Sequence, residues 1–207
     1  MLELLAPAGN LDAVIAAVQN GADAVYMGFG DGFNARRSAD NFTQESFAKA
    51  VRYCHIRGCK VYVTLNTLVG DREMDAAAAL AQQASDAGAD AILVQDLGLA
   101  RVLRAALPDI PLHASTQMSI HNLAGVEAAA EMGITRAVLA RELSLEQIRF
   151  ISQHASIETE VFVHGALCFC YSGQCYMSAL IGRRSGNRGA CAQPCRMQYS
   201  ICLLYTS

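Results

Sequence analysis

The sequence of 207 residues predicts an α/β fold of the (β/α)8 class, a TIM-like barrel that appears here without its eighth strand. Three observations predict it. Helical patterns alternate with short apolar runs, several helices end in a glycine just before such a run, and no Rossmann glycine fingerprint is present. A doubly wound parallel sheet is the alternative.

Four stretches share one pattern, an amphipathic helix end followed by a glycine and an apolar run. A glycine after a helix closes the last turn in the left-handed conformation. The runs are apolar on both faces, as in a buried parallel strand. Each pattern is therefore about one βα unit, and the four stretches are AAVQNGADAVYMGF, YCHIRGCKVYVTLN, ASDAGADAILVQDL and AEMGITRAVLAREL.

The same pattern, followed along the chain, predicts seven strands and six helices. We expect strands near 2–6, 24–28, 60–65, 91–95, 111–115, 136–140 and 159–164. We expect helices near 10–20, 44–57, 73–87, 97–106, 122–132 and 144–154, with Asn10, Thr43 and Ser144 as N-caps.

Seven βα units predict one barrel domain over residues 1–200, with a cysteine-rich loop over residues 165–196. The chain ends in ICLLYTS without an eighth strand. Because LLYTS resembles translated sequencing-adapter read-through, we expect residues 201–207 to be a non-native tail. A natural short C-terminus is the alternative.

Composition limits the classes of function. The chain is 53% hydrophobic, which suffices for one buried core, and its net charge of −3 gives no global nucleic-acid signal. Every acidic residue lies at or before Glu160, whereas residues 161–207 carry four arginines. This basic segment indicates an anionic partner, with a solvated loop as the alternative. Without a signal peptide or an apolar run of membrane length, we expect a cytoplasmic protein with no membrane partner.

Function in a barrel lies at the carboxyl ends of the strands. Polar amides and arginines at these ends predict a pocket for a small anionic molecule. His164 and Glu142 are candidates for proton transfer, and Asp96 is a possible acid–base partner of Glu142. The GFGDGF stretch lacks the lysine and hydroxyl of a Walker loop. The predicted pocket residues are Asn34, Arg36, Asn66, Gln117 and Arg141.

Five of the eight cysteines lie between Cys168 and Cys195. In a cytosolic chain such a cluster favours metal binding or catalysis over disulfides. Zinc sites usually show paired, closely spaced cysteines, whereas iron–sulfur clusters accept looser, loop-borne spacing. Spacing leaves iron–sulfur, zinc and structural thiols open, with the spacing Cys168-x6-Cys175-x15-Cys191-x3-Cys195 and Cys170 inside the first interval.

Protease signatures are absent from the sequence. It has neither the HExxH zinc helix nor the GxSxG nucleophile elbow. A thiol nucleophile at Cys168 activated by His164 is conceivable, but it leaves the other cysteines without a role. Cys54 and Cys59 fall on a helix end and a strand start, and we expect them in the core.

Several stretches resemble the collagenase-like peptidase family, the U thirty-two peptidases. They are APAGNLDAVIAAVQNGADAVYMG, FNARRSADNF, TLNT and EVFVHGALCFCYSGQCYMSALIGRRSGNRGACAQPCR, and the resemblance covers residues 1 to about 200. The family signature runs through Glu160, Phe162, Gly165, Ala166, Leu167, Cys168, Gly173, Cys175, Met177 and Ser178.

The resemblance implies a 4Fe-4S cluster and a choice of substrates. Members of this family act in hydroxylation of a tRNA uridine with prephenate, of a ribosomal RNA cytidine, or of ubiquinone precursors. The resemblance implies that Cys168, Cys175 and Cys191 correspond to three of the family's cluster ligands. The family's fourth ligand lies further downstream than this chain extends. Cys195 is the second choice for it, because only some members share the Cys-x3-Cys spacing.

The sequence and the resemblance together predict an iron–sulfur RNA-modifying enzyme, most similar to the prephenate-dependent tRNA uridine 5-hydroxylation group. Arg183, Arg184 and Arg188 are expected to contact RNA phosphates. A collagenase-like peptidase is one alternative, although no nucleophile or metal-bound water can be identified for it. A non-catalytic iron–sulfur scaffold that works beside a partner protein is another.

Overall fold

The computed structural model of the chain describes residues 2–30, 32–35, 41–166 and 168–200. The predicted pocket residue Arg36, the signature residue Leu167 and the predicted tail 201–207 lie outside these described residues.

Seven parallel strands form one sheet in chain order from β1 to β7. The strands are β1 (Leu5–Pro7), β2 (Ala24–Met27), β3 (Lys60–Leu65), β4 (Ala91–Val94), β5 (Leu112–Ala114), β6 (Arg136–Val138) and β7 (Glu158–Glu160). The helices are α1 (Leu11–Gln19), α2 (Gln44–His55), α3 (Met74–Asp86), α4 (Leu97–Ala106), α5 (Leu123–Glu131), α6 (Leu145–His154) and α7 (Met177–Gly182). Single turns of 3-10 helix are η1 (Asp71–Glu73), η2 (Thr116–Met118), η3 (Gly186–Arg188) and η4 (Pro194–Arg196).

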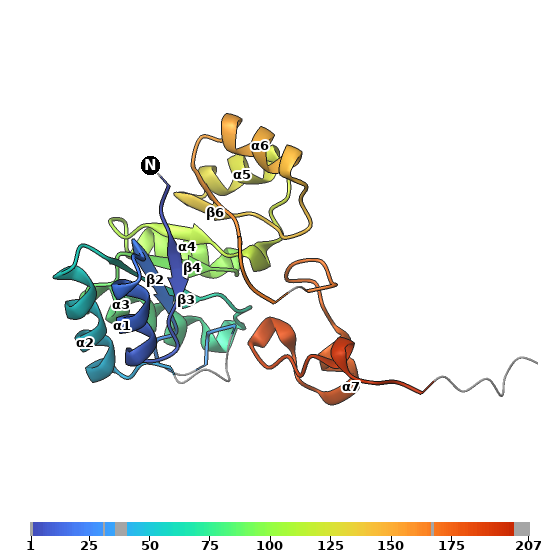
Figure 1. Ribbon diagram of the computed structural model, residues 1–207, viewed down its shortest axis with the longest axis horizontal. Coiled ribbons are helices and arrows are strands. Elements are labelled where there is room, and N and C mark those ends of the chain that lie inside the picture. The colour runs from blue at the N-terminus through green and yellow to red at the C-terminus, as the bar shows by residue number, and fades with distance from the viewer. Residues whose placement is uncertain (1, 31, 36–40, 167, 201–207) are drawn as a thin grey trace, which may run out of the picture.

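The barrel prediction is confirmed and the doubly wound alternative is wrong. A doubly wound sheet reverses its strand order at one point, whereas here each strand pairs with its successor and the order never reverses. The sheet curls with the helices around its outside (Figure 1). Within the described residues, β1 pairs only with β2 and β7 only with β6, so the curl remains open.

Two clusters of apolar side chains pack against the sheet. The larger cluster lies between the strands and the helices and includes Phe47, Leu65 and Leu103. A smaller cluster fills the inside of the curl, where Tyr62 and Leu93 meet Val138. Strands buried on both faces are nearly continuous apolar runs, and this pattern is clearest in β2, β3 and β4.

Local signals in the sequence fix the helix ends. The side chains of Asn10, Thr43 and Ser144 accept backbone N–H groups of the first turns of α1, α2 and α6, as predicted. The four repeated glycines follow α1, α2, α3 and α5 with positive φ angles between 70° and 96°, which non-glycine residues rarely adopt. They are Gly21, Gly58, Gly88 and Gly133.

The last predicted strand is shorter than expected. We predicted residues 159–164, but β7 ends at Glu160, because β6 offers only Arg136–Val138 as pairing partners. From Val161 onward the chain leaves the sheet and forms the cysteine-rich segment, residues 161–200, which carries α7, a helix that the sequence did not predict. The segment lies apart from the outer helices (orange to red in Figure 1). None of the helices formed by the described residues has the length and apolar character needed to cross a bilayer.

Candidate functional site

The carboxyl ends of the strands gather polar side chains at one end of the curled sheet, here called the mouth. Between the strands lies a cavity of about 50 Å³, lined by Thr64, Asn66, Ser115, Glu160 and Phe162 among others. Such a volume holds at most two water molecules, since each occupies about 30 Å³ in the liquid. The cavity is therefore too small to enclose a metabolite.

Two predicted pocket residues hold the mouth loops together. Asn66 follows β3, accepts a hydrogen bond from the Ala35 amide at 3.0 Å and donates to the Ser115 hydroxyl at 3.2 Å. Asn34 is buried, and its amide donates to the Asn41 side chain at 3.0 Å. The structure thus brings Asn34 and Asn66 to the mouth, where both order the loop after β2.

The glycine-rich stretch after β2 is explained by this amide pair. A Cβ atom on Gly28 would lie 2.0 Å from the Asn34 amide nitrogen and 2.2 Å from the Asn41 oxygen. Only glycine permits the strand to approach these side chains so closely. Gly28 therefore serves packing, in agreement with the missing Walker residues.

Ser172 anchors the cysteine-rich segment to the mouth. This fully buried residue donates its backbone N–H to Glu142 at 2.6 Å and its hydroxyl to the second Glu142 oxygen at 2.9 Å. The hydroxyl oxygen accepts from the Arg141 side chain at 3.2 Å and from the Arg141 amide at 3.3 Å. A further hydrogen bond joins the Ser119 hydroxyl to the Ser172 carbonyl. Sequence reasoning did not single out Ser172, although it lies inside the family signature.

Gly173 lets the same turn approach the loop after β5. Its φ is +72°, and a Cβ atom there would lie 2.1 Å from the carbonyl oxygen of Gln117. The obstruction is backbone, which cannot rotate away as a side chain can. Gln117, a predicted pocket residue, thus contributes its main chain to docking, and its carbonyl also accepts from Gln95 at 3.4 Å.

Arg188 forms a second anchor, on the loop between β3 and α3. Its guanidinium donates to both carboxylate oxygens of Glu73, at 2.6 and 2.9 Å, and to the Leu68 carbonyl at 2.7 Å. Hydrogen bonds from Arg188 and from the Gly70 amide lower the pKa of Glu73 to about 2. Of the three arginines predicted to contact RNA, Arg188 is therefore engaged within the protein. Arg183 and Arg184 are exposed, although the Arg184 Nε–H donates to the Ala190 carbonyl at 3.0 Å.

The two proton-transfer candidates occupy different settings. Glu142 anchors Ser172, and although burial raises its pKa, the Ser172 hydrogen bonds outweigh burial and lower it. His164 is exposed on the segment after β7. Asp96 caps α4 by accepting the Leu99 amide at 2.8 Å and also accepts from Val69 at 3.3 Å. These contacts give Glu142 and Asp96 docking and capping functions.

The cysteines divide into two groups. Cys54 and Cys59 are buried in the core, as predicted. Cys168, Cys191 and Cys195 are exposed, and Cys175 is half-buried beside Cys170. Burial and the hydrogen-bonded Cys175 thiol raise the pKa of Cys170. Among the described residues, no three His, Cys, Asp or Glu side chains are already gathered around one point as metal ligands require.

The donor set nevertheless fits an iron–sulfur cluster in its chemistry. Free thiols on one loop-borne segment are the ligands that such clusters take, and loose spacing is compatible with them. The two anchors hold the segment over the mouth. Cys170, which matches no ligand position of the family signature, is the thiol in contact with Cys175.

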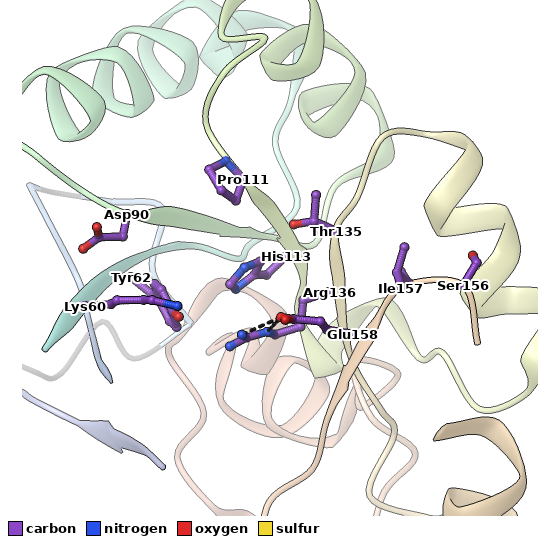
Figure 2. Close-up of a pocket in the computed structure, with 10 residues that line it drawn as sticks. All are labelled: Lys60, Tyr62, Asp90, Pro111, His113, Thr135, Arg136, Ser156, Ile157 and Glu158. Atoms are coloured by element: carbon purple, nitrogen blue, oxygen red, sulfur yellow. Dashed lines mark hydrogen bonds and ion pairs between the residues drawn. The ribbon is translucent and has the colours of Figure 1, made fainter. Parts of the chain in front are cut away.

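The larger cavity lies at the opposite end of the strands, here called the base (Figure 2). It measures about 530 Å³, and its lining includes Lys60, Tyr62, His113, Arg136 and Glu158. These residues begin or precede their strands or lie one or two positions into them, so the cavity is far from the mouth in the topology. Residues at this end of a barrel serve stability rather than catalysis.

A charge network occupies the base. The nearly buried Arg136 pairs with Glu3 at 2.5 Å and with Glu158 at 2.6 Å, and lies 3.6 Å from Glu160. Although burial raises the pKa of Glu3, hydrogen bonds from Arg136, Tyr62 and Lys60 lower it to about 2.

Burial also shifts the pKa values of two further groups near Arg136. Burial raises the pKa of Glu160. Burial, with a smaller contribution from Arg136, lowers the pKa of His113 to about 3, so this histidine is neutral.

Several curated proteins are similar to nearly the whole chain, and each of them is about twice as long or longer. The chain is 45% identical over 200 residues to the 23S rRNA 5-hydroxycytidine synthase of Escherichia coli, covering 97% of this chain and 30% of that protein. It is 41% identical over 199 residues to the tRNA hydroxylation protein P1 of Bacillus subtilis, covering 96% of this chain and 47% of that protein. It is 36% identical over 211 residues to a collagenase of Porphyromonas gingivalis, covering 96% and 50%. The chain thus spans from under a third to half of the length of these relatives.

Solved structures and family models agree with the fold. The U32 peptidase Mk0906 superposes with a TM-score of 0.67 over 82% of this chain and 71% of that one, at 18% identity. This likeness concerns the fold alone. The model of Peptidase family U32 matches residues 9–205, nearly the whole sequence. The chain therefore belongs to Peptidase family U32.

Proposed function

We propose that the chain is the barrel part of an iron–sulfur enzyme that hydroxylates a pyrimidine base of RNA. One observation carries the proposal: the signature cysteines lie on a segment that Ser172 and Arg188 fasten over the mouth, where barrel chemistry takes place. Relatives named for rRNA and tRNA hydroxylation match this whole region. Because the chain spans only part of them, the activity of the whole protein is part of the proposal.

The proposed cluster ligands are Cys168, Cys175 and Cys191, with Cys195 or a cysteine outside this chain as the fourth. The exposed thiols of Cys168 and Cys191 are accessible to incoming iron and sulfide. A 4Fe-4S cluster supplies one-electron chemistry when bound. The chain's own contribution is the anchored position of the segment, which keeps these thiols beside the mouth.

The finer proposal is 5-hydroxylation of a tRNA uridine with prephenate as co-substrate. Prephenate carries two carboxylates, and an exposed arginine at the mouth suits such an anion. Arg141 donates its Nε to Ser172, which orients the guanidinium at the mouth. Asn66 and the Gln117 loop border the same region. Exposed Arg183 and Arg184 are the proposed phosphate contacts.

The test is mass spectrometry of nucleosides from cells that lack the endogenous gene and express the complete protein. We expect Cys168→Ser, Cys175→Ser and Cys191→Ser each to abolish the hydroxylated pyrimidine and to lower bound iron and sulfide after anaerobic purification. Cys170→Ser is the matched control, because this thiol shares the segment but not the signature, and it should retain both. Wild-type protein without iron and without hydroxylated nucleosides would refute the proposal.

A peptidase remains the second candidate, because a relative named a collagenase is 36% identical across 96% of the chain. It requires a nucleophile or a metal-activated water at the mouth. Cleavage of denatured collagen peptides, abolished by a single substitution such as His164→Ala, would favour it. Unchanged peptides alongside hydroxylated RNA would exclude it.

A further inference from the structure

Exposed aromatic side chains concentrate on the cysteine-rich segment. Six Phe and Tyr side chains are exposed among the described residues, and five of them follow Glu160. Phe169 is 81% exposed, Tyr171 72% and Tyr176 66%. Leaving such large apolar surfaces in water is unfavourable, and gathered exposed apolar groups mark interaction sites. We therefore expect the cysteine-rich segment to bind a partner.

The charge around these rings selects the class of partner. Residues 161–207 hold four arginines and no aspartate or glutamate, whereas residues 1–160 have a net charge of −7. Arg183 and Arg184 follow α7 directly and are exposed. A segment that carries exposed aromatic side chains and arginines but no acidic residue matches a polyanion with flat rings of its own, such as a nucleic acid strand.

The anchors place the rings beside the mouth. Tyr171 immediately precedes Ser172, which Glu142 and Arg141 hold, so the Tyr171 backbone is fixed at the end of β6. Tyr176, five residues after Tyr171, occupies the position that precedes α7. Phe162 lines the small cavity between the strands while remaining half exposed. A nucleic acid strand that contacts Tyr171 would therefore lie beside the mouth.

We propose that Phe169, Tyr171 and Tyr176, here called the aromatic platform, stack unpaired bases on either side of the target nucleotide in a single-stranded RNA loop. This proposal rests on the proposed function and specifies its substrate. The ring faces are reached only by bases that are not stacked within a duplex, so the platform selects loops and unpaired ends. Arg183 and Arg184 contact the phosphates of the same strand.

Fluorescence anisotropy of the complete protein with a short, unstructured, pyrimidine-rich RNA measures this contact. Tyr171→Leu and Tyr176→Leu keep apolar bulk but remove the stacking face, and each is expected to weaken binding by about tenfold. The matched control is Phe150→Leu, which removes an exposed ring on α6, 4.5 Å from the His154 ring and outside the segment. It should bind as wild type does.

The salt dependence of RNA binding distinguishes the contribution of the aromatic rings from that of the arginines. Arg183→Gln should reduce the slope of log affinity against log salt by about one, whereas the Tyr→Leu variants should leave the slope unchanged. The same RNA annealed to its complement should bind much more weakly than the single strand. Equal affinity for the duplex would overturn the aromatic platform.

Two comparisons distinguish failure of the platform from failure of the proposed function. If wild-type protein hydroxylates RNA but Tyr171→Leu and Tyr176→Leu bind it as well as Phe150→Leu does, the platform is wrong and the function stands. If wild-type protein neither binds nor hydroxylates RNA, both are wrong. If light scattering shows that the Tyr→Leu variants change the mass of the protein in solution while RNA affinity is unaltered, the surface is a protein interface and the platform is overturned.

Discussion

The two ends of the curled sheet use charge in opposite ways. At the base, Arg136 pairs with Glu3 and Glu158 and lies 3.6 Å from Glu160, so these charges are held within the fold. At the mouth, neutral amides and hydroxyls dominate, and Glu142 and Arg141 both turn toward Ser172 of a separate segment. The charges at the base thus contact one another, whereas the mouth holds the cysteine-rich segment, whose described residues belong to neither core cluster.

This difference separates stability from function within one chain. Every residue of the two core clusters, including those packed at their margins, precedes Glu158. The cysteine-rich segment is held instead by hydrogen bonds, by the ion pair of Arg188 with Glu73 and by a close backbone approach at Gly173. Loops carried by a rigid scaffold are the usual place for binding and catalysis. Changes at the base should therefore act on global unfolding, and changes at the anchors on the segment alone.

The largest effect is expected from Arg136→Met. The substitution keeps volume but leaves three carboxylates without their buried partner, and removing one member of a buried ion pair costs about 3–5 kcal/mol. Urea denaturation measures the loss of unfolding free energy. Lys60→Met is the control, because Lys60 pairs with the same Glu3 from an exposed position and should cost less than about 1 kcal/mol. Equal losses for the two variants would remove the distinction between the ends.

Gly173→Ala should release the segment without unfolding the barrel. The left-handed backbone alone costs roughly 1–2 kcal/mol for alanine, and the contact with the Gln117 carbonyl adds to it. Hydrogen exchange at the Ser172 amide should accelerate by about tenfold or more, while the denaturation midpoint stays unchanged. Gly182→Ala is the control in the same segment, since a Cβ there meets no atom within 4 Å. Unaltered exchange in Gly173→Ala would mean that the turn does not dock as described.

The fold was predictable because its signals are local. The strands and helices follow apolar periodicity, and the caps at Asn10, Thr43 and Ser144 lie within three residues of their partners. The length of β7 was not predictable, because it depends on where β6 ends. Alternation in EVFVH is equally compatible with a strand that continues past Glu160.

The anchors of the candidate site escaped prediction because their partners are remote in sequence. Ser172 lies 30 residues from Glu142, Arg188 lies 115 residues from Glu73, and Arg136 lies 133 residues from Glu3. No periodicity encodes such pairs. The family signature around Ser172 and Gly173 could be identified in the sequence. Its cysteines indicated a chemical function, but nothing in the sequence indicated that the serine and the glycine hold the segment in place. The cluster itself stays a prediction.

Ser172→Ala tests the first anchor with a smaller change. The variant loses the hydroxyl contacts to Glu142 and Arg141 but keeps the backbone hydrogen bond, so docking should weaken by about 1 kcal/mol. Exchange of the neighbouring amides measures the change. A double-mutant cycle with Glu142→Gln provides the control, because the second substitution should cost less once the hydroxyl is gone. Strictly additive effects would show that the two groups do not interact.

The smallest effect is expected at the second anchor, where Glu73 and Arg188 are both partly exposed. Their contact lowers the pKa of Glu73 from its ordinary 4.5 to about 2, so the folded protein favours the ionised form. The stabilisation is then complete above the ordinary pKa and is lost as the pH falls through about 2. The side-chain Nε resonance of Arg188 should consequently stay constant from about pH 6 to about pH 4 in wild type. In Glu73→Gln the resonance should move to the position of an unpaired arginine. The hydrogen-exchange rates of the backbone amides in the cysteine-rich segment should increase only slightly. A midpoint near the ordinary pKa of a glutamate in wild type would show that the ion pair is not formed in solution, and that Ser172 and Gly173 hold the segment alone.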